Sequence, residues 1–267
     1  MFVIDLSRKR LKSLVGRVPE GKDTVVCQHN KLKTLEGLPD SVEVVMCSFN
    51  PLLTSLEGLP KGLKKIDCRE TALHSLKGLP EGVEEVSCSG CSITSLEGLP
   101  KGVRAINCSN NKLSSLKGLP EGVETVKCYN NDLRSLKGLP PGVKEVYCGR
   151  NHLTSLEGLS EGLSIIDCRH NQITSLEGLP EGLIEIFCYD NELKTLEGLP
   201  EGVETVYCSD NKLTSLEGLP DSVDYLMYGK NPIWFKHFIQ GTLLPIYINY
   251  RSTDINTGIL RLIKHIK

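Results

Sequence analysis

Apolar residues recur along this chain in one pattern that repeats about every twenty residues. In the stretch that ends at Pro220, the apolar positions are Val203, Val206, Cys208, Leu213, Leu216 and Leu219. An asparagine, Asn211, stands three positions after the cysteine. The same pattern can be followed back to the N-terminus. A fixed period of this length predicts tandem structural units that stack on their neighbours, and not one globular core.

Each unit is predicted to contain a strand, a turn and a return segment. Val206-Tyr207-Cys208 alternates apolar, outward and apolar positions, which is the period of a strand. Asn211 is expected to turn inward, where its amide can bond backbone groups that would otherwise be buried without partners. Leu199-Pro200-Glu201-Gly202 has the residues of a type I turn. The return is too short, and too rich in glycine and proline, for a helix.

This apolar line with its asparagine is similar to the L-x-x-L-x-L-x-x-N-x-L pattern of leucine-rich repeats, over about residues 1 to 233. The period and the Leu-Pro ending resemble the short "bacterial" class, known from type III secreted effectors and also found in giant viruses. One departure is that Glu217-Gly218 or Lys117-Gly118 stands where that class usually has a second proline. The resemblance implies an α/β solenoid dominated by β-structure: a curved horseshoe with a parallel concave sheet, a non-helical convex side and a small C-terminal cap.

Three regions are expected along the chain: a degenerate N-terminal capping repeat (residues 1–21), tandem repeats (22–232) and a C-terminal cap with helices (233–267). Asn231-Pro232 is a helix-start signal, and Asp254 could begin a second helix. From residue 229 onward the chain carries six Lys or Arg against one acid. The tail could therefore be a docking or targeting element and not only a cap.

Ten of the eleven cysteines occupy the same repeat position, which predicts an internal ladder of thiols. They are Cys27, Cys47, Cys68, Cys88, Cys108, Cys128, Cys148, Cys168, Cys188 and Cys208. Free cysteine behaves as a small buried hydrophobe. So many reduced thiols, without a signal peptide or an apolar run of roughly 20 residues, favour a cytoplasmic or host-cell intracellular location.

Two cysteine motifs invite a catalytic interpretation, and the repeat register explains both more simply. Cys88-Ser89-Gly90-Cys91 is formally C-x-x-C, but Cys91 takes the asparagine position and no second pair completes a zinc site. Two copies of C-x-D, Cys188-Tyr189-Asp190 and Cys208-Ser209-Asp210, resemble the catalytic motif of ubiquitin ligases attached to some bacterial leucine-rich effectors. In those proteins the motif lies in a separate helical domain after the repeats. No catalytic residue, metal or cofactor is therefore expected.

The outward strand positions and the residues just after them vary from repeat to repeat, which favours a binding role. The concave surface is the usual binding surface of a solenoid. Tyrosine and arginine, which are enriched in interface hot spots, concentrate in the later repeats. The strand propensity of aromatic residues is the alternative explanation. The candidate partner-binding residues are Tyr129, Tyr147, Arg150, Asp167, Arg169, Phe187, Tyr189, Tyr207 and Tyr225.

The chain is therefore predicted to be a non-catalytic scaffold or adaptor that binds a partner protein on its concave face. A net charge of −2 does not favour nucleic acid, and no small-molecule substrate is expected. Two alternatives remain open. The chain could be the substrate-recognition module of an effector or ubiquitin-ligase-type system, or an adaptor that acts through its basic tail.

Overall fold

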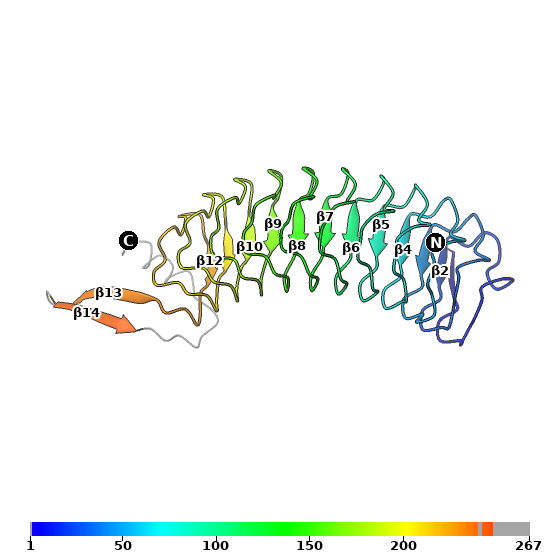
Figure 1. Ribbon diagram of the computed structural model, residues 1–267, viewed down its shortest axis with the longest axis horizontal. Helices are drawn as coiled ribbons and strands as arrows, with labels where there is room; N and C mark the ends of the chain where they lie inside the picture. The colour runs from blue at the N-terminus through cyan, green and yellow to red at the C-terminus, as the bar shows by residue number, and fades with distance from the viewer. Residues whose placement is uncertain (1, 240–241, 248–267) are drawn as a thin grey trace. The chain divides into compact units, whose positions relative to one another are not determined.

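The computed structural model describes residues 2–239 and 242–247, and the chain divides into two compact units. The first unit comprises Met1–Leu133 and Lys137–Val143, and the second comprises Arg134–Leu136 and Lys144–Lys267. Twelve short parallel strands follow one another in chain order, one in each coil of a solenoid (Figure 1). The predicted β-dominated solenoid is confirmed, and no helix occurs in the described residues.

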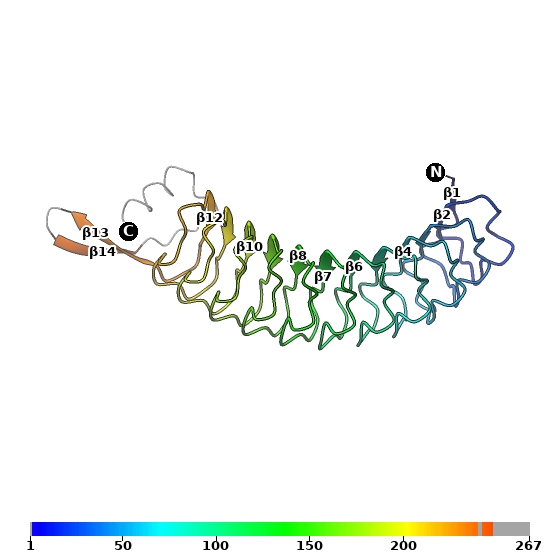
Figure 2. The same ribbon diagram turned by 90° about the horizontal axis from the view of Figure 1, so that it is seen from above.

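The strands have three residues in every coil. In the first unit they are β1 (Val3–Asp5), β2 (Thr24–Val26), β3 (Val44–Met46), β4 (Lys65–Asp67), β5 (Glu85–Ser87), β6 (Ala105–Asn107) and β7 (Thr125–Lys127). In the second they are β8 (Glu145–Tyr147), β9 (Ile165–Asp167), β10 (Glu185–Phe187), β11 (Thr205–Tyr207) and β12 (Tyr225–Met227). Figure 2 shows that the strands lie along one side of the coils and the return segments along the other.

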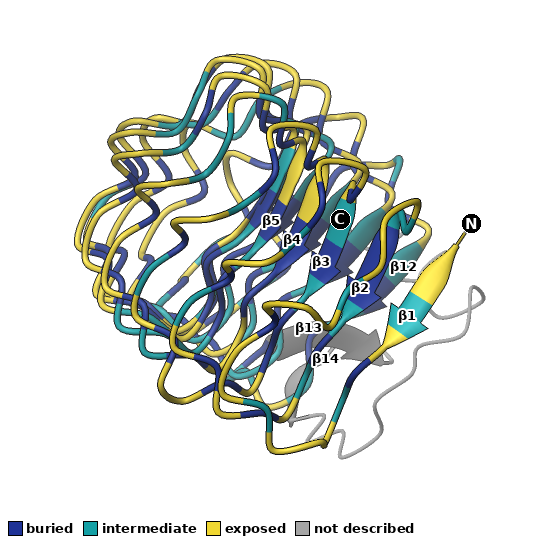
Figure 3. Cartoon of the chain, turned by 90° about the vertical axis from the view of Figure 1, so that its right-hand side faces the viewer, coloured by how far each residue is buried: buried dark blue, intermediate teal, exposed yellow. Residues whose placement is uncertain are grey.

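The interior of the coils is made of the apolar positions that define the repeat. Val206, Cys208 and Leu213 are each 0% exposed. Neighbouring strands pair in register, so that Ile186 lies opposite Val206 and equivalent side chains stack about 4.8 Å apart. The middle residue of strands such as β3 and β5 is buried between more exposed ones (Figure 3). Each coil therefore buries its apolar side chains between its two neighbours.

A glycine with a positive φ lies in the part of the return segment where this chain departs from the short repeat class. Gly118 has a φ of +101°, and a Cβ there would lie 2.9 Å from the carbonyl carbon of Leu96 in the preceding coil. Neither proline nor any other L-residue fits that conformation and spacing. A turn occurs where it was predicted but one residue later, since the Val203 N–H donates to the Pro200 carbonyl over 3.2 Å and proline is therefore the first residue of the turn, not the second.

The helix expected after Asn231-Pro232 is wrong. Strand β13 (Trp234–Ile239) pairs antiparallel with β14 (Thr242–Tyr247), with Phe235 opposite Ile246. The two segments contain many aromatic and β-branched residues, which favour strands. Pairing also satisfies their backbone polar groups, and together these effects outweigh the local helix-start signal. The second expected helix, from Asp254, lies outside the described residues. In the described part of the chain, no helix could cross a membrane.

Candidate functional site

The surface of interest is formed by the outward side chains of β8 to β12 in the second unit, which we call the strand face. The middle residue of each strand is buried, and the first and third residues point outward. The first residues are Glu145, Ile165, Glu185, Thr205 and Tyr225; the third residues are Tyr147, Asp167, Phe187, Tyr207 and Met227. The register of the sheet places each set in a line across the strands.

Three predicted site residues form a continuous aromatic row on the strand face. The Phe187 and Tyr207 rings stack with centroids 4.5 Å apart and planes 10° apart. Tyr207 in turn contacts Tyr225, with centroids 5.4 Å apart at 49°. Phe187 and Tyr207 meet because they are register partners on β10 and β11. All three rings are half-buried, so the row keeps an accessible apolar face.

Three further predicted residues, Asp167, Arg169 and Tyr189, form a second cluster. The Arg169 Nε lies 3.2 Å from the Asp167 Oδ2, and its Nη1 donates to the Tyr189 hydroxyl over 2.7 Å. The guanidinium carbon also lies 5.6 Å from the centroid of the Tyr189 ring. Arg169 is thus held between a carboxylate and an aromatic ring, both supplied by this chain.

Asp167 is less accessible than its outward strand position suggests. The residue is only 6% exposed. Burial raises the pKa of its carboxyl, and the nearby Arg169 charge opposes that rise only in part. Asp167 therefore positions Arg169 more than it presents a free carboxylate to a partner.

Tyr147 lies beside acidic side chains at the start of the strand face. Its hydroxyl donates to the Glu145 Oε2 over 3.2 Å. Partial burial raises the pKa of Tyr147, and the negative charges of Glu145, Glu185 and Asp167 raise it further. Negatively charged side chains therefore surround the Tyr147 hydroxyl.

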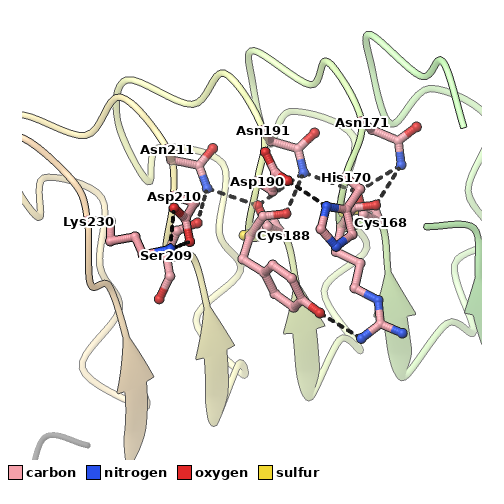
Figure 4. Close-up of polar contacts among 12 residues, drawn as sticks. Cys168, His170, Asn171, Cys188, Asp190, Asn191, Ser209, Asp210, Asn211 and Lys230 are labelled. Atoms are coloured by element: carbon pink, nitrogen blue, oxygen red, sulfur yellow. Dashed lines mark hydrogen bonds and ion pairs between the residues drawn. The ribbon is translucent and has the colours of Figure 1, made fainter. Parts of the chain in front are cut away.

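A column of left-handed residues runs along the end of the strands and was not found by sequence reasoning. His170, Asp190, Asp210 and Lys230 have φ values of 53°, 55°, 52° and 58°. Asp190 contacts the His170 Nδ1, and Lys230 Nζ lies 3.1 Å from the Asp210 Oδ1 (Figure 4). A signal existed, because asparagine and aspartate tolerate this conformation and recur at this repeat position.

The inward asparagines behave as predicted and bind the backbone of two coils. The Asn211 Nδ2 donates to the Cys208 carbonyl over 3.1 Å and to the Cys188 carbonyl of the preceding coil over 3.0 Å. Its Oδ1 accepts the Leu193 N–H over 3.0 Å. Asn171 and Asn191 repeat this arrangement (Figure 4). These amides fix the end of each strand, and therefore the strand face itself.

Two predicted site residues do not join the clusters described above. Tyr129 belongs to the first compact unit, while the aromatic row belongs to the second. Arg150 is exposed and sits in the left-handed column, with a φ of 51°, and not on the strand face.

All eleven cysteines are free thiols, and their burial bears on the catalytic alternatives. Cys188 is 0% exposed and points into the interior, and burial raises the pKa of its thiol well above its usual range. Burial likewise raises the pKa of Cys208 to about 12. A nucleophilic cysteine requires an accessible thiolate, which neither C-x-D copy supplies. The described residues contain no group of three metal-ligating side chains.

Known structures with the same architecture include bacterial effectors. YopM from Yersinia enterocolitica superposes with a TM-score of 0.68 at 28% identity, over 87% of this chain and 56% of its own. YopM of Yersinia pestis, described as a leucine-rich effector protein, gives a TM-score of 0.61 at 23% identity, over 86% of this chain and 77% of its own. No family model and no curated sequence matches the chain.

A third similar structure is the leucine-rich-repeat part of FLRT2, in a complex with latrophilin 3 and Unc5D. It gives a TM-score of 0.69 at 20% identity, over 86% of this chain and 82% of its own. The FLRT2 structure shows the same fold, and the likeness to Yersinia enterocolitica YopM confirms the predicted leucine-rich-repeat solenoid of the short class. This chain spans just over half the length of the Yersinia enterocolitica YopM chain, so the likeness concerns the repeats.

Proposed function

We propose that this chain is a non-catalytic interaction scaffold or adaptor, and that the strand face of its second unit binds a partner protein. The observation that carries the proposal is the aromatic row of Phe187, Tyr207 and Tyr225. Stacked rings present a rigid apolar surface whose ordering costs little conformational entropy on binding. Such residues are over-represented among interface hot spots.

The first unit provides an internal comparison. The outward positions of β1 to β7 hold no aromatic residue; they include Val26, Met46, Ser87 and Asn107. Both units share the same interior pattern, so the fold does not require aromatic residues on its strands. Their concentration on β8 to β12 supports selection for binding there.

The similar structures support a protein as the partner. FLRT2 occurs in an assembly with two other proteins, and YopM of Yersinia pestis is described as an effector. The reduced cysteines fit an intracellular setting such as an effector would meet in a host cell. The partly exposed carboxylates of Glu145 and Glu185 disfavour a nucleic acid as the partner.

The test is capture of partners by the purified full chain from lysates of the source cell and of host cells, read by mass spectrometry. The wild type is compared with Phe187→Ser/Tyr207→Ser. The matched control is Val26→Ser/Met46→Ser, which alters the same register position on neighbouring strands of the first unit. Circular dichroism first establishes that all three proteins fold.

We expect a protein captured by the wild type and the control to be lost from Phe187→Ser/Tyr207→Ser. A protein retained equally by all three would contradict the strand-face site and would favour the basic tail. Failure of the wild type to capture any protein in either lysate would contradict the proposed function itself.

A further inference from the structure

We propose that the strand face recognises a basic segment of its partner protein, with arginine or lysine side chains lying against the aromatic row and the carboxylates of Glu145 and Glu185. This inference rests on the proposed function, because it names the chemistry of the partner at that same site.

The charge on the strand face has one sign. Its outward positions include the partly exposed carboxylates of Glu145 and Glu185 and hold no lysine or arginine. The Asp167 carboxylate is buried against Arg169. Glu204 and Asp224, which directly precede β11 and β12, are exposed and add negative charge beside the aromatic row. Opposite charges on two surfaces accelerate encounter and select among partners, so a basic segment is favoured.

Glu185 differs from its counterpart in the first unit because neither of its register partners is basic. Glu85, at the same strand position of β5, forms an ion pair with Lys65 of β4. The register partners of Glu185 are Ile165 and Thr205, which carry no charge. Within the described part of the chain, neither Glu145 nor Glu185 forms an ion pair with a lysine or arginine. The cation is therefore left for the partner to supply.

Arg169 shows how such a cation would be held. Its guanidinium lies between the Asp167 carboxylate and the Tyr189 ring, with a hydrogen bond to the Tyr189 hydroxyl. Glu185 and Phe187 on β10, followed by Tyr207 on β11, offer the same two components, a carboxylate and aromatic rings. A guanidinium gains from both, through Coulomb attraction and through the electron-rich ring face.

The spacing of the carboxylates sets the kind of segment that fits. Glu145 and Glu185 are at equivalent positions two strands apart, on β8 and β10. Two strand spacings correspond to about 10 Å. In an extended peptide, side chains two residues apart project to the same side about 7 Å from each other, and long basic side chains can span the remainder. An extended segment with alternate basic residues is therefore the proposed ligand.

The test measures binding of a labelled nine-residue peptide with alternating arginine and serine to the full chain, by fluorescence anisotropy. Two variants change the site: Glu145→Gln/Glu185→Gln removes its charges and Phe187→Ser/Tyr207→Ser removes its rings. The charge-matched control is Glu177→Gln/Glu197→Gln, which removes two exposed carboxylates from return segments instead of strands. A peptide with glutamate in place of arginine is the ligand control.

We expect either site variant to weaken arginine-peptide binding by about tenfold, because each removes half of the cation site. The charge-matched control should bind within twofold of wild type, and the glutamate peptide should not bind. The charge variant should also lose most of the salt dependence of binding. Equal weakening by Glu177→Gln/Glu197→Gln would show attraction to acidic surface in general and would overturn the proposal.

The basic tail of this chain is the competing occupant. The full-chain variant Arg261→Ser/Lys264→Ser/Lys267→Ser tests it with the same peptide. Unchanged affinity supports a separate partner. Affinity that rises several-fold would identify the tail as the resident ligand and overturn the proposal of a partner segment.

The two proposals fail in different ways. Suppose that a protein is captured through Phe187 and Tyr207 and yet resists displacement by the arginine peptide and binds equally well to Glu145→Gln/Glu185→Gln. In that case the proposed function stands and the inference of a basic ligand is wrong. If the peptide binds at the site but no protein is captured from either lysate, the recognition chemistry stands and the proposed function is wrong.

Discussion

The side-chain amide of Asn211 joins two coils by donating to the carbonyl of Cys188, which lies 23 residues earlier in the chain. The same amide nitrogen bonds the Cys208 carbonyl of its own coil. Asn211 is 7% exposed, so water cannot easily replace these bonds. One small side chain therefore satisfies backbone groups from both sides of a repeat boundary.

Replacing Asn211 with alanine should lower the free energy of unfolding by about 2–3 kcal/mol, because buried carbonyls and the Leu193 N–H lose their partner. Asn211→Thr should cost less, since Thr71 occupies the equivalent position and donates to the Cys68 carbonyl over 2.8 Å. Urea denaturation followed by circular dichroism measures both. Equal costs for threonine and alanine would contradict this account.

Gly218→Ala should be strongly destabilising, by about 2 kcal/mol or more, because of both conformation and space. Gly218 has a φ of +84°, and a Cβ there would lie 2.3 Å from the Glu197 backbone nitrogen. The control is Gly182→Ala, where the nearest atom would lie 3.6 Å away. Thermal melts of the two variants should separate clearly; similar melting temperatures would show that the coil can relax around Gly218.

The ladder thiols should remain unreactive in the folded chain. Under native conditions a thiol reagent should label Cys91 first, because it is partly exposed while the other ten cysteines are buried. The ten should react only at the rate of unfolding, and all eleven should react at once in denaturant. Rapid labelling of several native thiols would mean that the coils open without unfolding globally.

Stability should also fall as the pH rises through the alkaline range. Burial raises the pKa of Cys27, Cys108 and Cys208 to about 12, whereas the ordinary pKa of a thiol in the unfolded chain is 9.0. Above pH 9 the unfolded chain therefore loses protons that the folded chain keeps, and unfolding becomes easier by about 1.4 kcal/mol per pH unit for each such thiol. Urea denaturation at pH 8 and pH 10 measures the difference. Replacing Cys108 with alanine should reduce this pH dependence.

Arg169→Met should make the free energy of unfolding depend on whether the Asp167 carboxyl is protonated. Burial already raises the pKa of this carboxyl, and removal of the guanidinium removes the charge that opposes the rise. The unpaired carboxylate destabilises the variant at pH 7, by about 1–3 kcal/mol. Because the folded pKa lies above the unfolded one, stability should be regained as the pH falls through the folded pKa.

The double variant Asp167→Asn/Arg169→Met provides the control for this prediction. It lacks the titrating carboxyl, so it should be more stable than Arg169→Met at pH 7 and show no such recovery at low pH. A double-mutant cycle from urea denaturation gives the coupling between the two residues. A coupling near zero would mean that Arg169 is held by Tyr189 alone.

Much of the fold follows from the sequence because every repeat position has one environment. Val206, Cys208 and Asn211 could be placed inward by their spacing alone, and register then placed Phe187 beside Tyr207. The prediction of a helix after Pro232 was wrong because this segment forms a strand, which is stabilised by pairing with a second segment. The local signal at Asn231-Pro232 contains no information about the segment that β13 pairs with.

The outward placement of the candidate residues on the strands could be predicted from sequence, but the contacts among their side chains could not. The repeat register identified Asp167 and Arg169 as outward, yet it could not indicate that the arginine covers the carboxylate. Side-chain geometry decides that point, through the reach of Arg169 to the Tyr189 hydroxyl. The left-handed column was missed because its signal, asparagine or aspartate at one repeat position, is interrupted by residues such as Arg150 and Lys230.

The bond from each inward asparagine to the coil before it has a genetic consequence. Consider a deletion that runs from the residue after one ladder cysteine to the next ladder cysteine. It removes one complete repeat and leaves equivalent contacts at the junction, because Asn191 and Asn211 bond the preceding coil in the same way. Unequal recombination between repeats of the gene can thus shorten or lengthen the protein without a folding penalty at the junction. Such variants would share one fold and differ only in which outward residues are neighbours on the sheet, so natural selection could act on their binding surfaces.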